Sequence, residues 1–78
     1  MWWYLVKQID NTDNVIYTYG RETLEQSGIL SYNKITKEFI VVKLADNDTE
    51  KSANKLLPHL HRMIFQENCP DKRQIAIG

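Results

Sequence analysis

The hydrophobic pattern of this 78-residue chain changes its period once, close to residue 48. Before that point, short segments rich in β-branched and aromatic residues are separated by clusters of turn-forming residues. After it, apolar residues recur at three- and four-residue spacing, which is typical of one face of a helix. Strands followed by a helix predict an α+β fold. The chain is long enough for one such domain, residues 1–78.

Four strands are predicted in the first half of the chain. The clusters at 10–14 and 33–37 contain side chains that hydrogen-bond their own backbone, so each indicates a hairpin turn. Within the second turn, Lys37 stands where glycine would most easily adopt a positive φ. The predicted strands are 2–9, 15–19, 28–32 and 38–44.

A helix is predicted over 48–67. Asn47, with Glu50 three residues later, is close to a capping box. Pro58 lies well inside the pattern and removes one backbone hydrogen bond, so we expect either a kink there or two shorter helices. The predicted end of the helix is set by Asn68, which tolerates the left-handed conformation, and by Pro70. The apolar stripe consists of Ala53, Leu56, Leu57, Leu60, Met63 and Ile64.

A fifth short strand is predicted over 73–77, which gives the order β-β-β-β-α-β. The first strand is apolar on both faces, and such a strand at a sheet edge would promote aggregation. We therefore place the fifth strand beside it, antiparallel to the first and parallel to the fourth, with sheet order 5-1-2-3-4. The two predicted faces of the first strand are Trp3, Leu5 and Ile9 on one side and Trp2, Tyr4 and Val6 on the other.

One helix covers one face of a sheet, yet the first and fourth strands are apolar on both sides. Something else should cover part of the second face, unless the tryptophans simply fill a small core. The alternatives are a second copy of the chain, a different protein, or the 20–27 connection folding back. The predicted partner surface is Trp2, Tyr4 and Val6, and a homodimer is the favoured assembly because twofold pairs are the commonest.

The net charge is zero, from ten basic and ten acidic side chains. That balance argues against nucleic acid as the main partner. Residues 1–50 carry five basic and eight acidic groups, a net of −3, whereas residues 51–78 carry five and two, a net of +3. The alternative function is therefore weak nucleic-acid binding through a basic stripe on the helix. Its residues are Lys51, Lys55 and Arg62, with Tyr17, Tyr19 and Tyr32 as surfaces for base stacking.

No catalytic, metal or cofactor site is predicted. His59 and His61 are two residues apart on a helix and point about 200° from each other, so they cannot chelate one ion. Cys69 falls at the negative end of the helix dipole, which disfavours a reactive thiolate. The acidic segment 46–50 lacks the glycine and terminal glutamate of a calcium loop.

Cys69 is the only cysteine, so no disulfide forms within one chain, and a lone thiol fits a reducing compartment. The longest apolar run, 1–6, is far shorter than the ~20 residues of a membrane span and lacks the features of a signal peptide. The sequence therefore predicts a cytoplasmic domain without membrane association. Its predicted role is a non-catalytic protein-interaction module that self-associates through its sheet.

Overall fold

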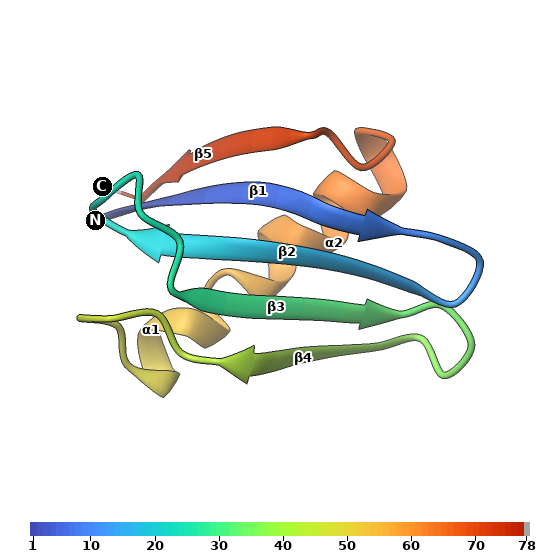
Figure 1. Ribbon diagram of the computed structural model, residues 1–78, viewed down its shortest axis with the longest axis horizontal. Coiled ribbons are helices and arrows are strands. Elements are labelled where there is room, and N and C mark those ends of the chain that lie inside the picture. Colours follow the sequence, from blue (N-terminus) through green and yellow to red (C-terminus); the bar gives the residue numbers. More distant parts are fainter. Residues whose placement is uncertain (78) are drawn as a thin grey trace.

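The computed structural model describes residues 1–77 and contains one five-stranded sheet with two short helices packed on one of its faces (Figure 1). The strand order is β4-β3-β2-β1-β5 and every neighbouring pair is antiparallel. The predicted fold class and sheet order are confirmed, and β1 is internal as expected. The elements are β1 (Trp2–Asp10), β2 (Asn14–Arg21), β3 (Gly28–Asn33), β4 (Glu38–Lys43), α1 (Glu50–Asn54), α2 (Leu57–Gln66) and β5 (Lys72–Ala76).

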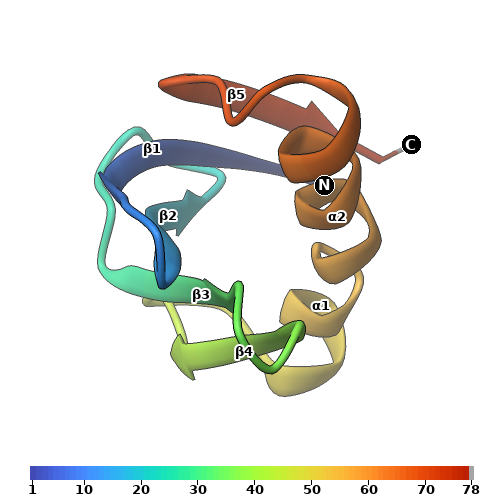
Figure 2. The same cartoon turned by 90° about the vertical axis from the view of Figure 1, so that its right-hand side faces the viewer.

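The hydrophobic core lies between the sheet and the two helices, which line up along the same side of the sheet (Figure 2). Alternate residues of the strands point into it, because successive side chains of a strand face opposite ways. We call this the inner face of the sheet and the opposite one the outer face. The largest fully buried side chains are Trp3, Tyr17, Tyr19, Leu5, Leu30, Leu56, Leu60, Met63 and Val15.

The predicted helix is divided in two, and the division comes before Pro58 rather than at it. The N–H groups of Lys55 and Leu56 donate to the carbonyls of Ser52 and Ala53, at 3.0 and 2.9 Å, so this turn is tightened to three-residue spacing. The second helix then starts at Leu57. Pro58 therefore lies in the first turn of α2, where a missing N–H costs no helical hydrogen bond.

The helix start differs from the prediction, whereas its end agrees. The cap is Thr49, whose hydroxyl accepts a hydrogen bond from the N–H of Ser52 at 3.1 Å. The predicted capping box of Asn47 with Glu50 is wrong, and Asn47 instead adopts a positive φ of 65° in the turn before the cap. At the other end Asn68 has a φ of 57°, which confirms the predicted left-handed stop.

The register of β4 shifts between the pairs Ile29–Lys43 and Leu30–Val41. Val42 is therefore an extra residue in this strand, and Lys43 lies with Ile29 on the outer face.

Two further irregularities lie in β1 and in the hairpin after β3. A bulge between Lys7 and Ile9 shifts the register of β1, so that Ile9 pairs with Ile16 and lies on the outer face. The prediction that Ile9 shares a face of the strand with Trp3 is therefore wrong. Lys37 has a φ of 62° in the hairpin between β3 and β4, which confirms the expected left-handed residue at that place.

The connection between β2 and β3 crosses the outer face, in front of β2 in Figure 1, whereas the helices lie behind the sheet. Gly20 permits this close approach, because a Cβ atom there would overlap the carbonyl oxygen of Glu25. The hydroxyl of Thr18 bonds the side-chain oxygen of Gln26 at 3.1 Å. Part of the outer face is thus covered by the chain itself, one of the alternatives that the sequence left open.

Candidate functional site

The predicted partner surface on β1 is half-buried. Trp2, Tyr4 and Val6 are all on the outer face, where Tyr4 pairs with Gly20 and Val6 with Thr18. These neighbours on β2 are the residues over which the connection between β2 and β3 runs. The three side chains therefore lie together as expected, but the chain leaves only part of each one in contact with solvent.

The most exposed apolar side chains of the sheet lie instead on β4, at its edge. Ile40 is 47% exposed and Val42 is 58% exposed, and Leu44, just after the strand, is 38% exposed. Because β4 pairs only with β3, the backbone groups on its other side face solvent. The sequence signal for this surface is the apolar pattern on both sides of the fourth strand.

A groove of about 400 Å³ runs along this same edge, between β4 and the two helices. Phe39 and Val41 point from the inner face of β4 toward it and are half-buried. Its volume falls within the range of small binding pockets. The residues that line it are Phe39, Ile40, Val41, Val42, Leu44, Glu50, Asn54 and Leu57.

A second hollow, of about 500 Å³, lies where the hairpin after β3 meets the end of α2. One wall is aromatic, with the rings of Tyr32 and Phe65 5.5 Å apart, and Lys37 stands at its rim. Cys69 also lines it, and burial raises the pKa of this thiol above its usual value. Because the protonated thiol is a poor nucleophile, this shift disfavours covalent chemistry at Cys69.

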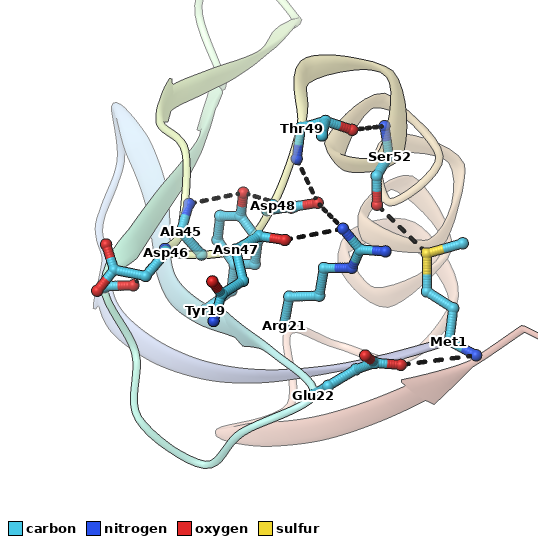
Figure 3. A network of polar contacts seen from close by, with 11 residues as sticks. Met1, Tyr19, Arg21, Glu22, Ala45, Asp46, Asn47, Asp48, Thr49 and Ser52 are labelled. Atoms are coloured by element: carbon cyan, nitrogen blue, oxygen red, sulfur yellow. Dashed lines mark hydrogen bonds and ion pairs between the residues drawn. The ribbon is translucent and has the colours of Figure 1, made fainter.

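A polar cluster ties the connection after β4 to β2 (Figure 3). The hydroxyl of Tyr19 donates to the carboxylate of Asp48 at 2.9 Å and accepts from the N–H of Ala45 at 3.1 Å. The same carboxylate accepts from the N–H of Thr49 and lies 3.8 Å from the Arg21 guanidinium. Burial raises the pKa of Tyr19 to about 12. These contacts hold the loop in place, and the buried Nε of Arg21 is left without a hydrogen-bond partner.

The three basic residues of the alternative prediction are all exposed to solvent. Lys51 lies on α1, Lys55 in the tightened turn and Arg62 on α2, so they do not share one continuous helix. The prediction that tyrosine rings of the sheet stack on bases is wrong. Tyr17 and Tyr19 are fully buried and Tyr32 is 4% exposed, so none of these rings is free to receive a base.

The two histidines lie in different surroundings. His61 is exposed and lies near the rings of Phe39 and Phe65, tilted to both, with ring centroids 5.5 and 4.6 Å away. His59 lines a smaller hollow of about 190 Å³ between α2 and β5. Within residues 1–77, no three potential ligand side chains come together in a way that could hold a metal ion.

No helix in the described part of the chain is long and apolar enough to cross a membrane. Comparisons of the chain with protein-family models, curated proteins and solved structures find no match.

Proposed function

We propose that this chain is a non-catalytic protein-interaction module that self-associates through its sheet. The observation that supports this most is the run of exposed apolar side chains on an edge strand, Ile40 and Val42, continued by Leu44. An edge of this kind is a template for pairing with another strand, and natural proteins normally protect it. A second copy of the chain would supply that protection.

The size of the domain adds to this proposal. A chain of this length buries only about 60% of the surface that its unfolded form exposes, and oligomerisation is one of the usual ways to stabilise such a small core. The single Cys69 excludes a disulfide within one chain as the alternative means. Its free thiol also fits our proposal that the protein acts in the cytoplasm.

Weak nucleic-acid binding through Lys51, Lys55 and Arg62 has less support. The net charge is zero, and the tyrosine rings that would stack on bases are buried. A titration of labelled single strands at low salt tests this alternative, because the double variant Lys55→Glu with Arg62→Glu should abolish any binding through the stripe.

Sedimentation equilibrium of the full chain over micromolar to millimolar concentrations tests the self-association. We expect the weight-average mass to rise from that of one chain to that of two, and to level off there because a twofold assembly is closed. A mass that stays at 9.2 kDa over the whole range would contradict the proposal.

A further inference from the structure

The two edges of the sheet differ in how they are protected. β5, at one edge, has four of its five residues exposed, and two of them, Lys72 and Arg73, are cationic. Charged side chains on an edge strand discourage pairing with another strand, because they would have to lose their hydration. β4, at the opposite edge, has charged residues only at its two ends. The four residues between them are Phe39, Ile40, Val41 and Val42.

The charges of β4 suit a second copy of the same strand. Glu38 is its first residue and Lys43 its last. When two copies of a strand pair antiparallel, the start of one lies beside the end of the other. Glu38 of each chain would then lie beside Lys43 of the other, twice in the same assembly. A parallel arrangement would instead bring Glu38 beside Glu38, which is unfavourable.

The faces of the sheet also match in this arrangement. Antiparallel pairing about a twofold axis perpendicular to the sheet keeps the outer faces of both copies on the same side. Because Val42 is an extra residue in β4, placing Glu38 opposite Lys43 brings Ile40 of one chain opposite Ile40 of the other on the outer face. On the inner face, the half-buried Phe39 and Val41 of one copy approach the edge groove of the other. Apolar side chains gain cover on both faces at once.

From these observations we infer that two chains pair antiparallel along β4, through their backbone edges, to form one continuous ten-stranded sheet. This inference rests on the proposed self-association and gives it a place and a geometry. It differs from the arrangement in which two outer faces stack through Trp2, Tyr4 and Val6. The edge at β5 stays free in each copy.

Hydrogen exchange of the unmodified chain tests the inference directly. In an antiparallel ladder, alternate N–H groups of β4 point away from β3 and are open to water in the single chain. Raising the concentration through the association range should slow their exchange about tenfold or more, while the outward N–H groups of β5 serve as the internal control. Dimerisation without slower exchange in β4 would overturn the inference and leave the proposed function standing.

A matched pair of substitutions tests which surface is used. Ile40 and Ile9 are both on the outer face and are 47% and 43% exposed, but Ile40 lies on β4 and Ile9 at the far end of β1. We expect Ile40→Lys to raise the dissociation constant about tenfold or more, since each dimer contains the change twice. Ile9→Lys should leave it within about twofold. Loss of the dimer in Ile9→Lys would contradict edge pairing and favour face stacking.

The charges provide a test of orientation. Each of Glu38→Lys and Lys43→Glu alone should weaken the dimer about fivefold, because it places like charges together at two symmetric positions. The double variant with both substitutions should regain the affinity of the unmodified chain. Additive weakening in the double variant would overturn the antiparallel arrangement. A chain that is monomeric in every experiment would instead refute the self-association itself.

Discussion

The two edge strands of this sheet are attached to the molecule in similar ways, yet they expose different chemistry. β5 turns Ile75 into the core and leaves mainly polar side chains toward solvent. β4 keeps Phe39 and Val41 half-buried on the inner face and exposes Ile40 and Val42 on the outer one. Position at a sheet edge therefore does not by itself decide whether a strand pairs with another chain. Pairing depends on the residues that face solvent. Removing water from apolar side chains is favourable, whereas removing it from charged side chains is costly.

Both edges are anchored by tyrosines of the same strand, β2. The hydroxyl of Tyr17 donates to the carbonyl of Pro70 at 2.6 Å and holds the segment that leads into β5. The hydroxyl of Tyr19 binds Ala45 and Asp48 and holds the segment that leaves β4. Each edge is thus held from the core by a tyrosine hydroxyl, and the edges differ most in the residues that face solvent.

The largest effect is expected from making the two edges alike. Lys72→Val combined with Gln74→Val gives β5 an apolar outer face, so that each chain has two edge strands able to pair with another chain. Association through both edges does not close, and we expect large open assemblies instead of a dimer. Light scattering at neutral pH measures this. Lys72→Gln, which removes the charge without adding apolar surface, should remain dimeric. A double valine variant that stays dimeric would show that β5 is protected by something other than its polar side chains.

The next largest effect is on stability, and it compares the contributions of β5 and β4 to the free energy of unfolding. Ile75→Ala removes a side chain that is 6% exposed and should lower the free energy of unfolding by about 3 kcal/mol. Val42→Ala removes one that is 58% exposed and should change it by less than about 0.5 kcal/mol. Urea unfolding at a concentration where the chain is monomeric gives both values. Equal losses would mean that the outer face of β4 contributes to the monomer's core.

A smaller difference is expected between the two tyrosine anchors. Tyr19→Phe leaves a buried N–H of Ala45 and one oxygen of the buried carboxylate of Asp48 without their partner, which should cost about 2 kcal/mol. Tyr17→Phe removes one bond to a carbonyl and should cost about 1 kcal/mol. Thermal or urea unfolding of both variants measures the difference. A larger loss in Tyr17→Phe than in Tyr19→Phe would show that the tyrosine hydroxyl contributes more to stability on the β5 side.

The smallest effect appears only at high pH. The pKa of Tyr19 is about 12 in the folded chain and about 10 when unfolded, because burial and the nearby Asp48 disfavour the phenolate. The unfolded chain therefore releases this proton first. The stabilisation is complete below about pH 10 and is lost as the pH rises toward 12, by about 1 kcal/mol per pH unit.

Burial also raises the pKa of Tyr17, so both anchors weaken in the same direction. Urea unfolding at several pH values between 9 and 11 should give a shallower decline for Tyr19→Phe than for the unmodified chain. An unchanged slope would mean that the Tyr19 hydroxyl titrates at its ordinary pKa.

Much of the fold could be predicted because it depends on local patterns. The two-sided apolar character of the first strand required a neighbour on each side, which placed β5 correctly. The helix end at Asn68 followed from the one residue there that tolerates a positive φ. The start of the helix was harder to predict, because Asn47 and Thr49 are both residue types that cap helices well. In the structure, the side chain of Thr49 is the one that lies beside a free backbone N–H of the first turn.

The candidate site was harder to predict from the sequence. The bulge that moves Ile9 to the outer face inserts one residue into the strand, and no apolar pattern marks it. The predicted surface of Trp2, Tyr4 and Val6 does lie on the outer face, but its exposure is reduced by a connection that crosses at Gly20. That crossing depends on how the connection packs over the sheet, which local sequence patterns do not predict.

By itself the sequence determined the class of the fold, through the single change of hydrophobic period, and the zero net charge. Only the tertiary structure decided which apolar residues remain available to a partner. Val6 and Val42 are chemically identical side chains on the outer face, yet Val6 is half-buried and Val42 is 58% exposed. β1 has a strand on either side and β4 has a strand on one side alone. Exposure depends on those neighbours, and the neighbours come from distant parts of the chain.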